Sequence, residues 1–286
     1  MCFRPPSIVK PAKCPDCGTV NPPTKKICSK CQADLTITQI NPINWFDIPV
    51  NDLLRAKTFY ETVFSYSLTI NETETPNRAY FPLTPAITGT SGSLVKADGY
   101  TPSETGCIVY LLVKDIPGTL AKIEANGGKI LQSQTAMGEL GFIAHFQDCE
   151  GNRVGLYTTT MAAKMNPVNW FEIPVNDLMK AKNFYKTVFS YSLPSSSKMG
   201  KLDMVWFPMK PKTPGTCGSL VKADGYIPAE TGNVVYLSVN DIPGTLVKIE
   251  ANGGKTLQPQ TELGELGFIA HFQDCEGNRV GLYKHK

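Results

Sequence analysis

The chain has 286 residues, of which 42% are hydrophobic and 19% are charged, and its formal net charge is +3. This composition is typical of a globular protein and excludes disordered and fibrous classes, and no apolar run approaches the roughly 20 residues of a membrane-spanning helix. The N-terminal segment MCFRPPSIVKPAK is broken by prolines and lacks the apolar stretch of a secretory signal. We therefore expect a cytoplasmic protein without a membrane partner.

The positive charge and four of the nine cysteines are concentrated near the N-terminus. Residues 1–40 carry a net charge of +4, whereas the rest of the chain carries −1. The four cysteines form two CxxC pairs, and the other five are scattered singly. This pattern indicates a metal site in a reducing compartment rather than a set of disulfides.

The two CxxC pairs lie in KCPDCGTVNPPTKKICSKCQADL, with ten residues between them. Two such turns can direct four thiolates to one tetrahedral ion, and a segment this short has no adequate apolar core of its own. We therefore predict a structural Zn²⁺ in a ribbon over residues 14–35, after an N-terminal extension over residues 1–13. The segment resembles a minimal zinc ribbon of the CPxCG type. The predicted ligands are Cys14, Cys17, Cys28 and Cys31.

The basic ribbon has two interpretations. Its lysines could contact a protein or a nucleic acid, or they could simply be solvated on a folded cap. No aromatic residue lies between Cys14 and Cys31 to stack on a base, which weakens the nucleic-acid interpretation.

After the ribbon, strand and helix periodicities alternate. Residues 45–50 alternate as a half-buried strand, and Asn51 or Asp52 can cap a helix with apolar residues at three- and four-residue spacing. Farther along, Asp115 can cap a second helix, which Gly127 and Gly128 would end. The expected strands of this half of the chain are 45–50, 68–73, 78–83, 91–96, 107–113, 129–134, 141–147 and 152–157. The predicted order of elements is two consecutive βαβββ modules.

The whole pattern is then duplicated. NPINWFDIPVNDLLRAKTFYETVFSY at 41–66 returns at 166–191 with 20 of 26 positions identical, and GELGFIAHFQDCEGNRVGLY at 138–157 returns unchanged at 264–283. A repeat of this length is a domain rather than a solenoid unit.

The motif NDLxRAKxFYxxVFSY after the first strand, the NGG that ends the second helix and the D-x-E-G-N turn before the last strand resemble the vicinal oxygen chelate superfamily. That superfamily includes glyoxalase I, bleomycin-resistance proteins and extradiol dioxygenases. The resemblance implies an α+β fold with two tandem domains, at 42–158 and 166–284. Each domain would consist of two βαβββ modules that form a curled mixed sheet, and the two domains would pair within the chain.

Metal-using members of this superfamily place four His or Glu ligands on the concave side of the sheet. Carried over to the first copy, these positions fall on Trp45, Ser93, Ile108 and Gly155. The second copy has Trp170, Ser219, Val234 and Gly281 there. A divalent ion needs several converging His or carboxylate ligands. We therefore expect no metal in the two domains.

The repeated histidines leave a different possibility open. By strand alternation His145 shares a face with Gln147 and could lie beside Asp47, and His271 could lie beside Glu172. Such a pair could act as general acid and base, form a non-standard metal site, or serve packing alone. The DCEGN segments behind the histidines have turn chemistry, and their cysteines have no base nearby in sequence to activate a thiolate.

The sequence thus predicts two aromatic-lined pockets, one per copy. The first pocket would be lined by Trp45, Asp47, Tyr110, His145, Arg153 and Tyr157. The second would be lined by Trp170, Glu172, Tyr236, His271, Arg279 and Tyr283. Such walls suit a small planar or amphipathic ligand, although the rings could also fill the space themselves.

Three functions follow as hypotheses. The first is a small-molecule-binding protein that works without the usual divalent metal. The second is a lyase, isomerase or dioxygenase that uses His145 with Asp47 and His271 with Glu172. The third is an interaction scaffold that acts through the zinc ribbon.

Overall fold

The computed structural model describes residues 12–13, 19–22, 25, 27–30, 41–71, 76–84, 87–159, 165–209 and 213–286. Residues 41–286 contain the two expected copies, and each copy contains two βαβββ modules. The α+β class and the order of elements are confirmed.

The first copy supplies two modules. The first consists of β3 (Ile43–Pro49), α1 (Leu53–Phe64), β4 (Thr69–Ile70), β5 (Asn77–Tyr80) and β6 (Ser91–Lys96). The second consists of β7 (Ile108–Leu112), α2 (Ile116–Ala125), β8 (Lys129–Ala136), β9 (Phe142–Gln147) and β10 (Arg153–Thr158), with a 3₁₀ turn at Gly138–Leu140.

The second copy repeats this order. Its first module consists of β11 (Val168–Pro174), α3 (Leu178–Phe189), β12 (Ser197–Met199), β13 (Leu202–Trp206) and β14 (Cys217–Lys222). Its second consists of β15 (Val234–Ser238), α4 (Ile242–Ala251), β16 (Lys255–Glu262), β17 (Phe268–Gln273) and β18 (Arg279–Lys284), with a 3₁₀ turn at Gly264–Leu266.

Each of the four helices begins at an aspartate N-cap. The Asp52 carboxylate accepts hydrogen bonds from the backbone N–H groups of Leu54 and Arg55, and the predicted cap Asp115 accepts one from Gly118. Aspartate at this position satisfies N–H groups that have no partner within the helix. Asp177 and Asp241 repeat these caps in the second copy.

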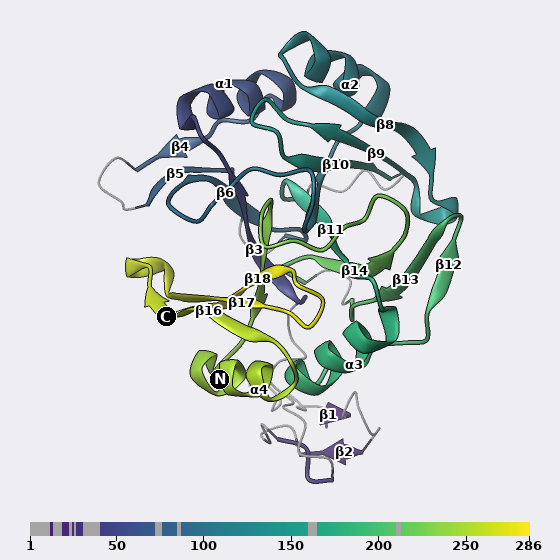
Figure 1. Cartoon of the computed structure of the whole chain (residues 1–286), viewed down its shortest axis with the longest axis vertical. Coiled ribbons are helices and arrows are strands. Elements are labelled where there is room, and N and C mark those ends of the chain that lie inside the picture. Colours follow the sequence, from purple (N-terminus) through teal and green to yellow (C-terminus); the bar gives the residue numbers. More distant parts are fainter. Residues whose placement is uncertain are drawn as a thin grey trace, which may run out of the picture.

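The sheets do not follow the two sequence copies. Within the described residues there are two eight-stranded mixed sheets, in the orders β12-β13-β14-β11-β7-β10-β9-β8 and β16-β17-β18-β15-β3-β6-β5-β4. Figure 1 shows this exchange: strands of the first copy continue directly into strands of the second. The expectation that each copy forms its own sheet is therefore wrong.

The exchange occurs where the modules meet. β7 pairs antiparallel with β11, with Tyr110 opposite Trp170, and β15 pairs antiparallel with β3, with Tyr236 opposite Trp45. β3 (INWFDIP) and β11 (VNWFEIP) are nearly identical in sequence. The local sequence pattern therefore allows β7 to pair with either β3 or β11, and only the tertiary structure shows which of the two it pairs with.

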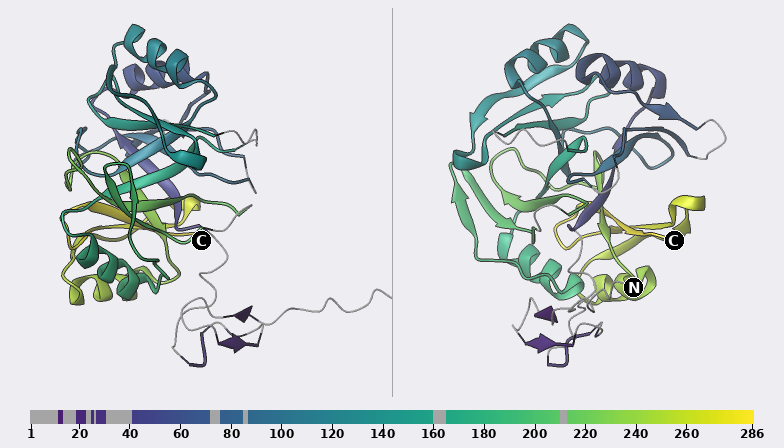
Figure 2. Two further views of the ribbon diagram at one scale, coloured as in Figure 1. Left: turned by 90° about the vertical axis from the view of Figure 1, so that its right-hand side faces the viewer. Right: turned by 180° about the vertical axis from the view of Figure 1, so that it is seen from behind.

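Within one copy, the two modules meet through their helices instead. Helix α1 contacts α2 at one end of the molecule, and α3 contacts α4 at the other (Figures 1 and 2). The modules of one copy are thus joined through side chains and helix packing, whereas backbone ladders join one copy to the other.

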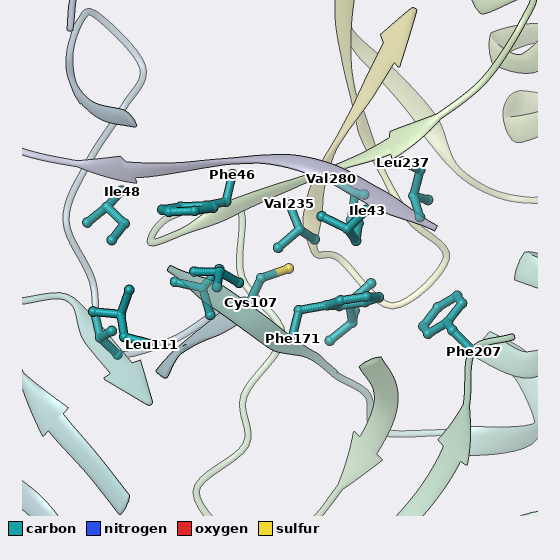
Figure 3. Close-up of a cluster of buried hydrophobic side chains, with 14 of the residues drawn as sticks. Ile43, Phe46, Ile48, Cys107, Leu111, Phe171, Phe207, Val235, Leu237 and Val280 are labelled. Carbon is teal, nitrogen blue, oxygen red and sulfur yellow. The ribbon is translucent and has the colours of Figure 1, made fainter. Parts of the chain in front are cut away.

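A single apolar core joins the two sheets. Figure 3 shows Phe46 and Val235 from one sheet opposite Leu111 and Phe171 from the other, and all four side chains are fully buried. Burial of each such side chain stabilises the fold by about 1.5–3 kcal/mol. Because strands alternate, residues such as Trp45 and Asp47 point away from this core, to the opposite face of their sheet.

Only part of the predicted ribbon lies within the described residues. β1 (Ala12–Lys13) pairs antiparallel with β2 (Val20–Asn21), and Cys28 is fully buried. The backbone N–H of Lys30 and the side-chain amide of Asn21 lie 3.5 and 3.6 Å from the Cys28 sulfur. The other three predicted zinc ligands, Cys14, Cys17 and Cys31, lie outside the described residues.

None of the helices in the described ranges combines the length and the apolar character that a bilayer-spanning segment requires.

Candidate functional site

Each sheet carries one of the repeated histidines on the face turned away from the shared core. His145 on β9 lies in the same sheet as Glu172 on β11, and His271 on β17 lies in the same sheet as Asp47 on β3. The predicted pairing of His145 with Asp47 and of His271 with Glu172 is therefore wrong, because the sheets form across the copies. We call the two clusters the Glu172 site and the Asp47 site.

In the Glu172 site, Tyr110 links the histidine to the carboxyl group. Its hydroxyl lies 2.6 Å from Nε2 of His145 and donates a hydrogen bond to Oε2 of Glu172. All three side chains are at most 1% exposed. The sheet itself and the loop that carries Tyr226 enclose the cluster.

The Asp47 site repeats the arrangement. Tyr236 donates to Oδ2 of Asp47 at 2.7 Å and lies 2.8 Å from Nε2 of His271. The hydroxyl of Tyr100 joins this cluster, 3.0 Å from the Tyr236 hydroxyl and 3.2 Å from the same histidine nitrogen. The carboxylate, tyrosine and histidine therefore form one continuous network in each sheet.

The Asp47 site also contains a buried ion pair. Arg78 on β5 donates to Asp47 and, at 2.6 Å, to the hydroxyl of Ser93. Ser93 in turn donates to Asp47 at 2.6 Å, and the indole N–H of Trp45 donates to the same oxygen at 3.0 Å. The Glu172 site lacks this pair, because Met204 stands at the position equivalent to Arg78.

The protonation of the histidines follows from their arginine neighbours. Nη2 of Arg153 lies 3.1 Å from Nδ1 of His145, and a guanidinium group can only donate. Nδ1 is then the acceptor, and the ring hydrogen is on Nε2, where it is donated to Tyr110. Oε1 of Gln132 also lies 2.9 Å from Nδ1, so this tautomer requires the amide of Gln132 to be turned with its NH₂ group towards the ring. Arg279, His271 and Gln258 repeat the arrangement.

The pKa values agree with neutral histidines. Burial, reinforced by the nearby arginine, lowers the pKa of both His145 and His271 to about 3. The two carboxyl groups differ. Burial raises the pKa of Glu172, whereas for Asp47 the charge and hydrogen bonds of Arg78 outweigh burial and lower the pKa.

The structure divides each predicted pocket between the two sites. Trp45 and Asp47 join Tyr236, His271, Arg279 and Tyr283, whereas Trp170 and Glu172 join Tyr110, His145, Arg153 and Tyr157. Every site therefore takes two of the predicted residues from one copy and four from the other.

Sequence reasoning missed several members of the network: Arg78, Tyr100, Gln132, Tyr226 and Gln258. The guanidinium groups of Arg153 and Arg279 lie 4.6 and 4.4 Å from the ring centroids of Tyr226 and Tyr100. Both tyrosines lie in the repeated segment GSLVKADGY, so the repeat could have identified them. Arg78 gave no such signal, since its equivalent is a methionine.

Partly exposed aromatic side chains lie above the buried network in both sites. Trp45 contacts Tyr80 with ring centroids 5.9 Å apart, and Trp170 contacts Trp206 at 4.9 Å. These are all three tryptophans of the chain. Rings over a rigid polar floor can bind the flat face of a small molecule.

Comparison with known proteins is consistent with this geometry. The family model described as Glyoxalase/Bleomycin resistance protein/Dioxygenase superfamily matches residues 42–156 and again residues 167–282. The chain belongs to this superfamily. No curated protein matches the chain.

Solved structures of the superfamily share the fold. Glyoxalase I from Zea mays is 21% identical, with a TM-score of 0.63 over 84% of this chain and 91% of that chain. A presumed dioxygenase from Bacillus subtilis subsp. subtilis str. 168 is 10% identical, with a TM-score of 0.59 over 86% of each chain. At these identities the likeness concerns the fold alone.

The superfamily's metal positions do not suit a divalent ion in this chain. In the sheet of the Glu172 site they are occupied by Trp170, Ser219, Ile108 and Gly155, and none of these offers an imidazole or a carboxylate. A Cβ on Gly155 would collide with the ring of Tyr110, so a glutamate would not fit there without rearrangement. Among the described residues, no group of three or more His, Cys, Asp or Glu side chains is arranged to hold a metal ion.

The repeated DCEGN segment is a turn, as predicted, and it also anchors a helix. The Asp148 carboxylate accepts from Tyr60 at 2.8 Å and from the backbone N–H of Asn152 at 2.9 Å. Glu150 accepts from the backbone N–H of Asn51 and from the side chain of Arg55, both at 2.8 Å, at the start of α1. The second copy repeats the turn with Asp274 and Glu276.

The two buried histidines predict a pH dependence of stability. Their folded pKa of about 3 lies below the value of 6.5 for a free side chain, so the unfolded chain binds the protons first. Stability is therefore lost as the pH falls from 6.5 towards 3. Replacing His145 or His271 by glutamine should reduce the slope of unfolding free energy against pH in that window by about 1.4 kcal/mol per pH unit for each histidine.

Urea unfolding of each variant across that window provides the measurement. His285→Gln, at the exposed C-terminus, is the matched control for the loss of a histidine. An unchanged slope in both His145→Gln and His271→Gln would show that these rings are not held neutral.

Proposed function

We propose that the protein binds small planar or amphipathic aromatic molecules on the concave faces of its two sheets, without the divalent metal of its superfamily. The observation that carries this proposal is the position of partly exposed tryptophan and tyrosine rings above a fully buried polar network. The rings would provide apolar contact area, and the network would keep the floor of the site fixed.

The buried network favours binding over catalysis. The hydroxyl of Tyr110 separates His145 from Glu172, and all three groups already satisfy one another. A general base has to reach a proton of the substrate within hydrogen-bond distance. Groups that are fully buried and paired in this way serve better to hold the floor of a site than to exchange protons with a ligand.

We also propose a structural zinc ion held by Cys14, Cys17, Cys28 and Cys31. The support within the described residues is the buried Cys28, with the N–H of Lys30 and the amide of Asn21 directed at its sulfur. Such donors stabilise a metal-bound thiolate. The basic segment around this ion would be the contact for a protein or nucleic-acid partner.

Metal analysis tests the zinc proposal. The full chain should contain about one zinc ion per chain, and the double variant Cys14→Ser, Cys17→Ser should contain almost none. Inductively coupled plasma mass spectrometry on gently purified protein gives the ratio. A Cys149→Ser, Cys275→Ser variant serves as the control for loss of two thiols, and zinc that persists without Cys14 and Cys17 would refute the ribbon.

Isothermal titration calorimetry tests ligand binding with three probes: 2-naphthol, 2-naphthoate and bleomycin. At least one probe should bind, and at least one of the two variants Trp45→Ala and Trp170→Ala should weaken its binding about tenfold, because each substitution removes a ring from the outer part of one site. Phe142→Ala is the matched control, since Phe142 is an exposed aromatic on the face of β9 opposite His145. No binding heat with any of the three probes would contradict the proposal.

A further inference from the structure

The two sites are equivalent by register but differ in several side chains, three of which bear on ligand binding. Arg78 pairs with Val95 on β6, and Met204 pairs with the corresponding Val221 on β14, so Met204 stands where Arg78 would be. By the same correspondence Glu172 replaces Asp47, and Trp206 replaces Tyr80. Because of these differences, the two sites differ in charge, in hydrogen bonding and in the aromatic rings at their outer surface.

In the Asp47 site, the polar groups near the carboxylate are already committed to one another. Arg78 is 3% exposed and donates to both Asp47 and Ser93, and Ser93 donates to Asp47. A ligand that reached this carboxylate would have to displace a buried ion pair and leave a charge without its partner. A polar group of a ligand would therefore have to compete with this ion pair for the carboxylate, although Nε of Arg78 is itself buried without a hydrogen-bond partner among the described residues.

In the Glu172 site, one buried hydroxyl is left over. Ser219 corresponds to Ser93, but its Oγ has no hydrogen-bond partner among the described residues, and the residue is 0% exposed. Ser219 is in register with Glu172 on one side and with Trp206 on the other, so the three side chains lie on the same face of the sheet. A buried hydroxyl without a partner is costly, and a polar group of a ligand could satisfy it.

The outer part of the Glu172 site is also more apolar. The partly exposed rings of Trp170 and Trp206 meet at 60°, and the partly buried Met199 and Leu202 from the β12–β13 hairpin pack against the same cluster as Met204. The two indoles and Met199 form a polarizable surface that adapts to a flat ring, above the fully buried Met204.

The charges of this site are also engaged internally. Arg153 donates to the carbonyl of Gly225 at 2.8 Å and to His145, and it lies over the ring of Tyr226. The remaining titratable groups that face Glu172 are Tyr110, Tyr226 and the neutral His145. The guanidinium of Arg153 is thus held by these contacts, and only its buried Nε is left without a hydrogen-bond partner among the described residues.

From this geometry we infer that the Glu172 site is the ligand-binding site of the two, and that it takes an uncharged aromatic molecule carrying a hydroxyl group next to Ser219. The inference rests on the proposed function and narrows it to one site and one ligand class.

Fluorine NMR of protein labelled with 5-fluorotryptophan tests this directly, because the chain has only three tryptophans and all three line the sites. The full chain is titrated with 2-naphthol, and resonances are assigned with single Trp→Phe variants. The resonances of Trp170 and Trp206 should shift and saturate, whereas that of Trp45 should stay in place. The anion 2-naphthoate should bind at least about tenfold more weakly.

Two substitutions distinguish binding at this site from nonspecific hydrophobic binding. Ser219→Ala removes a hydroxyl that makes no hydrogen bond in the free protein, so it should leave the fold intact and weaken 2-naphthol binding about tenfold. Met204→Arg should weaken binding at least as much by recreating the ion pair of the Asp47 site, whereas its matched control Met204→Leu should keep binding.

Several results would overturn the inference: a saturable shift of Trp45 comparable to those of Trp170 and Trp206, equal affinity for 2-naphthoate, full binding by Ser219→Ala, or no shift of any resonance. If calorimetry still detects binding of another probe in any of these cases, the proposed binding function stands and only the choice of site and ligand fails. If no probe binds at all, both fail.

Discussion

The pairing of strands between the two copies is the constraint on which the rest of the structure depends. The β7–β11 ladder joins the two halves of one sheet, and the β15–β3 ladder joins the two halves of the other. These ladders place Tyr110 of one copy beside Glu172 of the other, and Tyr236 beside Asp47. Neither copy holds a complete network by itself. The duplication has therefore produced one structural unit with two composite sites rather than two independent domains joined end to end.

Strand pairing within each copy determines what lies at the positions that the resemblance to the superfamily assigns to metal ligands. In each sheet the tyrosine on the central strand fills the space beside a glycine at one of the metal positions, Tyr110 against Gly155 and Tyr236 against Gly281. Its hydroxyl then connects a neutral histidine to a carboxyl group. A buried chain of hydrogen bonds thus lies beside these positions. The result is a floor that is rigid and polar beneath rings that remain accessible.

The sequence predicted local structure well and long-range pairing poorly. Helix caps such as Asp52 and Asp115, the turn at Asp148 and the order of the modules all follow from local chemistry, and the structure confirms them. The partners of His145 and His271 could not be predicted, because β3 and β11 have almost the same sequence and alternation only fixes the face of a strand. The role of Arg78 and the lack of a partner for Ser219 could not be predicted either. Both follow from the presence of arginine in one copy and methionine in the other, and the effect of that difference depends on which strands pair in the sheets.

The most direct test of this account is to sever the chain between the copies. Residues 41–162 and 163–286 would be produced as separate chains, alone and together, and examined by size-exclusion chromatography with light scattering and by circular dichroism. Because every large sheet needs modules from both copies, the account predicts that the folded species are dimers, either the mixed pair or a pair of identical pieces, and that neither piece folds as a monomer. A stable, natively folded monomer of either piece would contradict the exchange of strands and, with it, the composite sites.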